Sequence, residues 1–140
     1  MNKLMTLGAA LIIAGVAAAP SLQTAVLAQP APVQPSPVKR TVLQKIDVPG
    51  TNLEMIYATV EIAPGFKAGR HNHPGVVMAQ VTEGEFWLAV DGQPEKILKA
   101  GESLTLPDRV IHNEGATDKG VKLSAVYVVE KGKPLASPAP

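Results

Sequence analysis

Cysteine is absent from this 140-residue sequence, which excludes disulfides and a lipid-modified cysteine. Aromatic residues make up only 4% of the chain, so valine, isoleucine and leucine must fill the core. After residue 28 no stretch repeats its apolar residues at helical spacing, which argues against a helical fold. Without disulfides the fold must be stabilised by a hydrophobic core, and a chain of this length suffices for one compact domain.

Net charge is also nearly absent. The sequence has 13 basic and 12 acidic residues, and Lys3 is the only charged residue among the first 28. Removing that segment leaves 12 of each, so the remaining chain is neutral when its histidines are neutral. A neutral chain argues against nucleic acid or an anionic membrane surface as a partner.

The N-terminus has the pattern of a secretory signal peptide. Lys3 precedes an apolar run over residues 4–19, Pro20 ends that run, and small or apolar residues lead to Ala28. We predict a signal peptide over residues 1–28, with cleavage near Ala28, because the run is short for a membrane span. An uncleaved anchor remains the alternative. The protein is then exported, meets a membrane only during export, and is expected in the periplasm as a domain without an anchor.

Proline marks the edges of the folded part. Prolines at positions 30, 32, 35 and 37 favour extended polyproline conformations, so residues 29–40 are predicted to be a linker that packs no core. Residues 134–140 have the same Pro/Ala-rich character and are predicted to be a tail. One domain is therefore expected over residues 41–133.

Period-2 alternation within that domain predicts strands. In Leu53–Ile62, the residues at 56, 58, 60 and 62 are apolar and share one face. Asp91-Gly92 is a two-residue hairpin signal, because both residues tolerate positive φ. Eight or nine short strands of this kind favour an all-β barrel or double-sheet jelly roll. The expected strands span residues 41–48, 53–62, 76–82, 85–90, 93–98, 102–106, 110–113 and 121–130.

The three histidines form the main candidate site. His71 and His73 are two residues apart in an extended stretch, so their side chains point to the same face. His112 lies in a separate apolar segment. Two histidines from one strand and a third from a distant strand are a common way to build a mononuclear metal site. A single histidine in a strand is more often a surface or hydrogen-bonded core residue, and that alternative stays open.

The spacing around these histidines resembles the two sequence motifs of the cupin superfamily. Four residues fit the first motif, G-x5-H-x-H-x(3,4)-E-x6-G, and three fit the second, G-x5-P-x-G-x2-H-x3-N. These residues are Gly65, His71, His73 and Gly84, followed by Gly101, Pro107 and His112. The layout is similar to that of small exported single-domain cupins. The resemblance implies a cupin jelly-roll β-barrel (double-stranded β-helix) with a metal at its mouth, while cupins serve as dioxygenases, isomerases, storage proteins and binding modules.

The glutamate ligand of the first motif falls on Val77, or on Met78 with the longer spacing. Neither side chain offers an oxygen, so the ligand set that the resemblance implies is His71, His73 and His112. Three neutral imidazoles would leave a divalent ion with its full charge of +2. All-nitrogen ligation favours Fe, Zn, Ni or Cu over Mn²⁺ or Mg²⁺.

Two residues are candidates for binding a substrate at this site. Val77 would make the side vacated by the glutamate apolar. Arg109 stands at the glycine position of the second motif, in the turn before His112. Its guanidinium would reach over the rim and orient a carboxylate or enolate through a bidentate contact, unless it is a surface charge. Glu61 and Glu85, near strand ends, are expected to be solvated charges rather than replacement ligands.

Three hypotheses follow from the sequence. The first is an exported cupin-domain protein that binds a divalent metal through three histidines and acts as a dioxygenase or Lewis-acid enzyme on a small oxygenated compound. The second is a non-catalytic binding module with a degenerate metal site and a small-molecule ligand. The third is a self-associating domain, a homodimer formed through the apolar segments 53–62 and 121–129. No residue was identified as a general base or nucleophile, so the sequence leaves open whether the protein is an enzyme.

Overall fold

The computed structural model describes residues 36–140, and all of its regular structure is β-strand. The predicted signal peptide and residues 29–35 of the predicted linker lie outside the described residues. Within residues 36–140 no helix is long and apolar enough to cross a membrane. The eight strands are β1 (Val38–Asp47), β2 (Leu53–Ile62), β3 (His71–Asn72), β4 (Gly75–Val90), β5 (Lys96–Lys99), β6 (Ser103–Leu106), β7 (His112–Glu130) and β8 (Ser137–Pro138).

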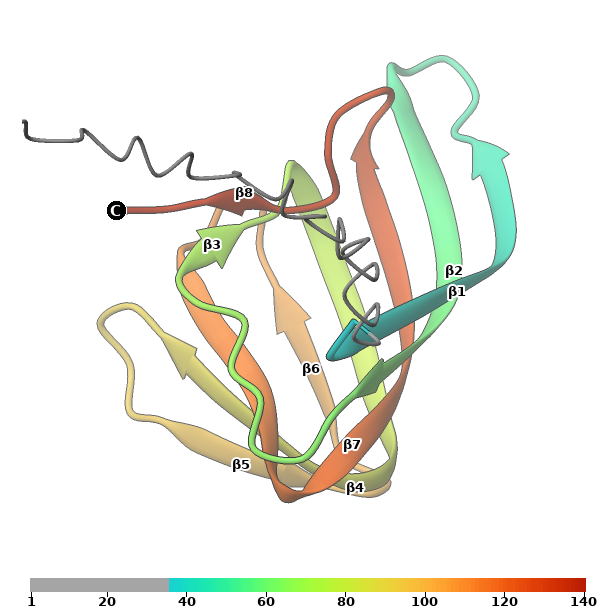
Figure 1. Ribbon diagram of the computed structural model, residues 1–140. Helices are drawn as coiled ribbons and strands as arrows, with labels where there is room; N and C mark the ends of the chain where they lie inside the picture. Colours follow the sequence, from blue (N-terminus) through green and yellow to red (C-terminus); the bar gives the residue numbers. More distant parts are fainter. Residues whose placement is uncertain (1–35) are drawn as a thin grey trace, which may run out of the picture. The chain divides into compact units, whose positions relative to one another are not determined.

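The strands form one curled antiparallel sheet (Figure 1). Its main path runs β1-β2-β7-β3-β8, and β4 pairs with β5, β6 and β7. The jelly roll expected from the sequence is confirmed. Its two longest strands, β4 and β7, are bent and pair with each other along nearly their whole length.

The bend in these strands explains why the sequence predicted four shorter ones. The β4–β7 register shifts twice near Gly84, so the chain turns a corner without leaving the sheet. Gly84 and Gly120 both have positive φ there, and a Cβ on Gly84 would lie 2.1 Å from the Gly120 carbonyl oxygen. Only glycine fits that approach. The strand break predicted at Gly84 is therefore a bend within β4. The break predicted after residue 113 is absent, because β7 continues through it.

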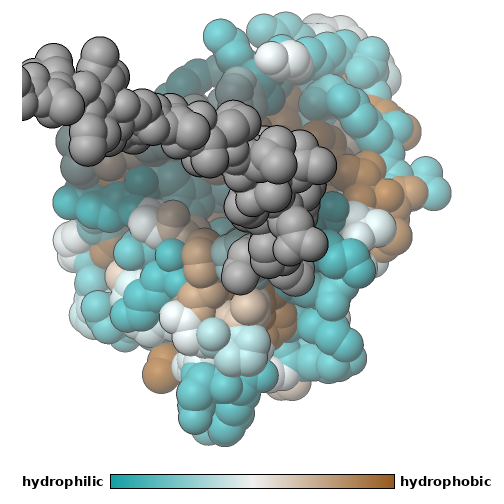
Figure 2. Space-filling view, viewed as in Figure 1, coloured by the Kyte–Doolittle hydropathy of each residue, from teal (hydrophilic) through white to brown (hydrophobic). Residues whose placement is uncertain are grey.

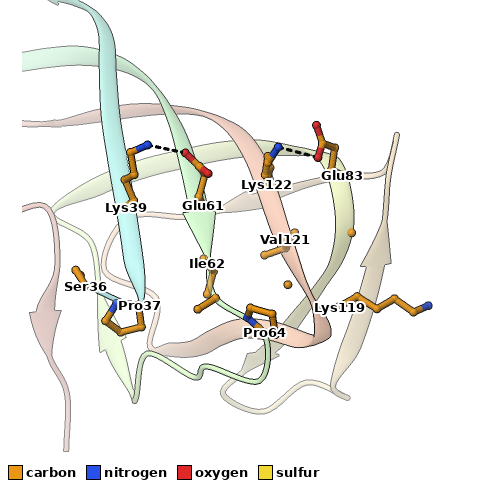
Figure 3. A pocket seen from close by; sticks show the side chains of 13 residues that line it. Ser36, Pro37, Lys39, Glu61, Ile62, Pro64, Glu83, Lys119, Val121 and Lys122 are labelled. Carbon is orange, nitrogen blue, oxygen red and sulfur yellow. Dashed lines mark ion pairs between the residues drawn. The ribbon is translucent and has the colours of Figure 1, made fainter. Parts of the chain in front are cut away.

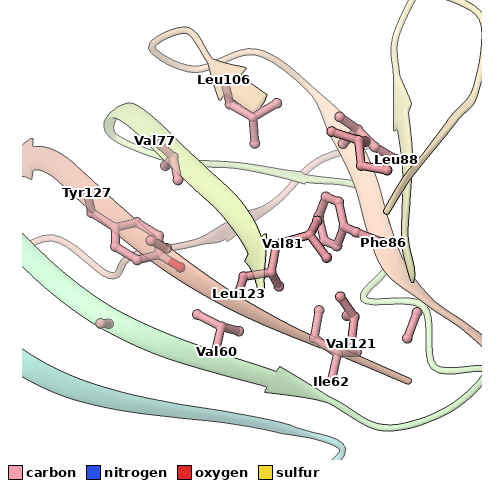
Figure 4. Packing of buried hydrophobic residues seen from close by; sticks show 14 of the residues in the cluster. Val60, Ile62, Val77, Val81, Phe86, Leu88, Leu106, Val121, Leu123 and Tyr127 are labelled. Atoms are coloured by element: carbon pink, nitrogen blue, oxygen red, sulfur yellow. The ribbon is translucent and has the colours of Figure 1, made fainter. Parts of the chain in front are cut away.

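The core fills the inside of the curl (Figure 4). The predicted inward face of β2 is confirmed, because each of its four apolar residues is at most 5% exposed. Most other members are aliphatic, as the scarcity of aromatic residues requires. The cluster comprises Ile56, Ala58, Val60, Ile62, Val77, Val81, Phe86, Leu88, Leu98, Leu106, Ala116, Val121, Leu123, Ala125, Tyr127 and Val129.

The predicted Asp91-Gly92 hairpin has the expected strands but a longer loop. Gly92 has a φ of 74°, and the Gln93 amide donates to the Val90 carbonyl, closing a four-residue turn. Pairing between β4 and β5 begins only at Lys96, opposite Leu88. The delay follows from Pro94, which has no amide hydrogen to donate to a ladder.

The structure changes the predicted character of both flanking segments. Residues 38–40, predicted as linker, already pair with β2. Ser137-Pro138, predicted as tail, form β8 against β3, and Leu135 packs on the core. Proline is tolerated in β8 because this strand lies at the end of the sheet path, where one side of the backbone needs no partner. Composition alone missed these edge pairings.

At the other end of that path, β1 carries exposed apolar residues. Val42, Leu43 and Ile46 are between 45% and 59% exposed, and Figure 2 shows hydrophobic surface over this strand. Exposed apolar edges invite pairing with another chain. Self-association remains a prediction.

Candidate metal centre

The sheet brings the three histidines together from segments far apart in the sequence. His71 in β3 pairs directly with His112, the first residue of β7, and His73 follows β3 by one residue. The ring centroids lie 4.3 Å apart for His71–His112 and 5.0 Å apart for the other two pairs. All three side chains are buried, and His112 is fully so.

Each histidine is held in the same tautomer by a backbone carbonyl. The Nδ1 atoms of His71, His73 and His112 lie 2.8, 2.5 and 3.0 Å from the carbonyl oxygens of Gly69, Leu135 and Val110 respectively. A carbonyl only accepts, so Nδ1 must carry the hydrogen and donate it. The Nε2 lone pair of each neutral ring is then free, which is the arrangement typical of metal-ligating histidines.

A fourth group completes the cluster, and the sequence analysis missed it. Glu114 Oε1 lies 3.8 Å from His71 Nε2, and Glu114 Oε2 lies 3.6 Å from His112 Nε2. One donor atom from each of the three histidines and Glu114 lies within 4.8 Å of all the others. The carboxylate therefore comes from β7 rather than from the motif position at Val77. The signal was present in the sequence, since His112-x-Glu114 has the same spacing as His71-x-His73.

The cluster leaves one buried atom without a partner. Among the described residues, His112 Nε2 is the buried side-chain nitrogen or oxygen that makes no hydrogen bond. Such an atom costs free energy unless something outside the protein's own groups satisfies it. A donor set of three imidazoles and a carboxylate suits a divalent transition metal, so the residues present fit the ion that the sequence implied.

Burial and the carboxylate act in opposite directions on these groups. Burial lowers the pKa of His73 below its usual value. For His112, burial lowers the pKa, but Glu114 and the Val110 carbonyl outweigh it and hold the pKa above the usual value. Burial raises the pKa of Glu114, while the three histidines, His112 foremost, bring it below its usual range. Glu114 is thus ionised at neutral pH, ready to act as an anionic ligand.

A small cavity lies directly beneath the cluster. The volume in which the centre of a water molecule fits is about 20 Å³, which is room for roughly one water. His73, Glu114, Val77 and Tyr127 are among its lining residues, and the Tyr127 ring centroid lies 5.9 Å from that of His73. Burial raises the pKa of the Tyr127 phenol. Val77 thus lies beside the cluster, as part of an apolar wall (Figure 4).

The second predicted substrate-binding residue lies elsewhere. The exposed Arg109 guanidinium forms an ion pair with Glu130 and lies 3.7 Å from Asp108. Its contact with the site is through the backbone, because the Arg109 amide donates to the His73 carbonyl. The geometry does not bring its side chain to the histidines.

A larger cavity lies at the corner where β4 and β7 bend (Figure 3). Its volume is about 410 Å³, and its charged groups are already paired as Lys39–Glu61 at 3.2 Å and Lys122–Glu83 at 2.9 Å. Glu85, close by, pairs with Lys119. Glu61 and Glu85 are therefore surface charges with lysine partners, as expected from the sequence, and neither belongs to the histidine cluster.

Comparison with known proteins identifies the family to which this fold is similar. The sequence matches a family model described as a cupin domain over residues 58–129. A cupin-like protein from Thermotoga maritima is 24% identical, with a TM-score of 0.56, covering 73% of this chain and 75% of that one. No curated protein sequence matches this chain.

Two enzymes of known structure share the same architecture. The polyketide cyclase RemF from Streptomyces resistomycificus is 19% identical, with a TM-score of 0.59, covering 74% of this chain and 72% of that one. The DMSP lyase DddQ from Ruegeria pomeroyi is 16% identical, with a TM-score of 0.61 over 73% of this chain. The alignment covers 51% of DddQ, so the chain spans about half that enzyme's length. At these identities the likeness concerns the fold alone.

Proposed function

The chain belongs to the cupin domain family, and on that premise we propose that it binds one divalent metal ion through His71, His73, His112 and Glu114. The observation that carries the proposal is the buried, unpartnered Nε2 of His112, at the point where all four donors converge. Three backbone carbonyls hold the rings with Nε2 free, so the site is organised before any ion enters.

Glu114 changes the charge and selectivity expected from the sequence. Three neutral imidazoles and one carboxylate leave a divalent ion with a net charge of +1, instead of the +2 of an all-histidine site. An oxygen donor also widens the choice of metal, so Mn²⁺ joins Fe, Zn, Ni and Cu as a candidate. When bound, such an ion supplies Lewis acidity to an oxygenated ligand.

We propose further that the ligand is a small oxygenated organic compound and that the site turns it over. Two solved structures with the same fold are named as a lyase and a cyclase, which supports the proposal that this site catalyses a reaction on a small molecule. The residues of this chain would position the ligand against an apolar wall formed by Val77 and its neighbours. Metal binding without turnover is the second candidate, because the described cavity beside the cluster holds only about one water.

Metal analysis of protein purified without a histidine tag tests the first proposal. After chelation and reconstitution separately with Fe, Zn, Ni, Cu and Mn, we expect about one equivalent of at least one metal. Less than about a tenth of an equivalent with every metal would overturn the proposal. Oxygen uptake and product analysis with small diketones and hydroxy acids then separate turnover from binding alone.

We also propose export, on the signal-like pattern of residues 1–28. Expression of the full chain followed by fractionation and N-terminal sequencing is the test. A mature start near Gln29 in the periplasmic fraction supports export. An intact Met1 in the cytoplasmic fraction contradicts it.

A further inference from the structure

Arg40 differs from the other two arginines of the described chain. Arg70 pairs with Asp91 at 2.6 Å, and Arg109 pairs with Glu130. Arg40 has no carboxylate partner among residues 36–140. Its Nε donates to the Tyr127 hydroxyl at 3.2 Å, and its guanidinium carbon lies 5.2 Å from the centre of the Tyr127 ring.

The register of β1 directs Arg40 to the inner face of the sheet. Arg40 lies opposite Val60, which is a core residue, whereas its neighbour Lys39 lies opposite Glu61 and pairs with it. Directly paired residues in antiparallel strands share a face. Arg40 is therefore a half-buried cation that shares a face with the core.

Tyr127 connects this cation to the metal centre. Its ring centroid lies 5.9 Å from that of His73 and 5.2 Å from the Arg40 guanidinium carbon. The guanidinium thus lies within about 11 Å of the His73 ring, a span that a small organic acid can cover. The described contacts use one of the five guanidinium N–H donors, so four remain for a carboxylate.

Resting on the metal site proposed above, we propose that Arg40 binds the carboxylate of an organic acid whose other oxygens reach the metal. A half-buried guanidinium whose described partners are a phenol and an aromatic face keeps free donors, which an anion satisfies better than a neutral group does. The substrate class is therefore a small carboxylic acid with a second oxygen function. Arg40 takes the role that the sequence had suggested for Arg109.

Calorimetric titration of the Zn-loaded protein with two matched series of acids tests the role of Arg40. The probes are malonate, succinate and glutarate, each compared with the monocarboxylate of equal carbon number. We expect at least one dicarboxylate to bind about 10-fold or more tighter than its monocarboxylate, because only it reaches both the metal and Arg40. In Arg40→Met that advantage should disappear, and Arg40→Lys should restore part of it.

Lys39→Met is the matched control, because it removes one positive charge from the same strand on the opposite face. It should bind both series within about twofold of wild type. Equal dicarboxylate binding by wild type and Arg40→Met, both with a full metal content, would overturn the role of Arg40 and leave the metal proposal standing. Absence of metal would overturn the proposed function instead. In that case the dicarboxylate affinities of wild type and Arg40→Met are compared in metal-free protein. Affinities that agree overturn the Arg40 proposal, and an affinity about 10-fold higher in wild type supports an anion site at Arg40.

Discussion

Two regions of the sheet differ in what their polar groups lack: the corner where β4 and β7 bend at Gly84, and the histidine cluster, which consists of His71, His73, His112 and Glu114. The corner carries a cavity of about 410 Å³, and the charges around it are solvent-exposed and paired with one another. The histidine cluster has a cavity of about 20 Å³ beside it, yet it holds three buried imidazoles and a carboxylate, and the Nε2 of His112 has no hydrogen-bond partner. Size would select the corner as the functional site, whereas unsatisfied chemistry selects the histidine cluster.

The comparison also separates two kinds of charged pair. Lys122–Glu83 at the corner is exposed to solvent on both sides, so it contributes little to stability and needs no further partner. His112 and Glu114 are largely withdrawn from water, so each depends on the other or on an ion. The effects of substitutions in the two regions should therefore differ in kind as well as in size.

The largest difference should appear when one group is removed from each of the two regions. His112→Ala removes a ligand and should lower Zn affinity by more than about 100-fold, beyond the 10–100-fold typical of losing an outer hydrogen-bond partner. Lys122→Ala should leave Zn affinity unchanged. Competition with a chromophoric chelator measures both. Equal metal affinity in the two variants would remove the distinction between the two regions.

The next effect concerns the C-terminal segment, which contacts the histidine cluster through the Leu135 carbonyl. Ending the chain after Lys133 removes β8 and the Leu135 carbonyl that accepts from His73 Nδ1. We expect Zn affinity to fall about 10–100-fold, because the His73 ring loses its orientation and tautomer. Leu135→Ala keeps the carbonyl and is the control, so it should stay within about twofold of wild type. A truncated protein with wild-type affinity would contradict this role of the tail.

A smaller effect should depend on pH in the metal-free protein. The lowered pKa of Glu114 stabilises the fold above about pH 4.3 and is lost as pH falls through its folded value. The raised pKa of His112 stabilises the fold below about pH 6.5 and is lost as pH rises through its folded value. The two contributions are both fully present only between about pH 4.3 and about pH 6.5.

Glu114→Gln should therefore reduce the free energy of unfolding by on the order of 1 kcal/mol near pH 5.5, and by less at pH 8. Urea denaturation with a chelator present measures it. Glu61→Gln at the corner provides the comparison, because its partner Lys39 does not titrate in this range. A Glu114→Gln effect that is constant between pH 5 and 8 would contradict the coupling to His112.

The smallest effect should be at the corner itself. Lys122→Gln removes one partner of the exposed Lys122–Glu83 pair, and the free energy of unfolding should stay unchanged within the error of urea denaturation. Metal affinity should also stay unchanged. A marked loss of either would mean that the corner does more than its paired charges indicate.

Much of the fold follows from local pattern, and the failures have local causes. Leu53–Ile62 alternates strictly between one buried and one exposed face, so its bounds were predicted correctly. β7 was divided into two strands because residues 114–120 contain two glycines and mixed polar residues. Their pairing with β4 and with the chain near Lys67 is a long-range contact that no local pattern contains.

The candidate site was predicted in part, for the same reason. The convergence of His71 and His73 depends on strand alternation, which operates locally. Glu114 was not predicted because the family motif places its carboxylate at the position of Val77, although the His112-x-Glu114 spacing contains the signal. Arg40 could not be found, since its approach to Tyr127 joins residues 87 positions apart.

X-ray absorption of the Zn-loaded protein tests most directly whether these four residues hold one ion. The account predicts three imidazole nitrogens at about 2.0–2.1 Å and a carboxylate oxygen at about 2.0–2.2 Å, with the carboxylate signal lost in Glu114→Gln. A spectrum with fewer than three imidazoles, or one that Glu114→Gln leaves unchanged, would contradict it.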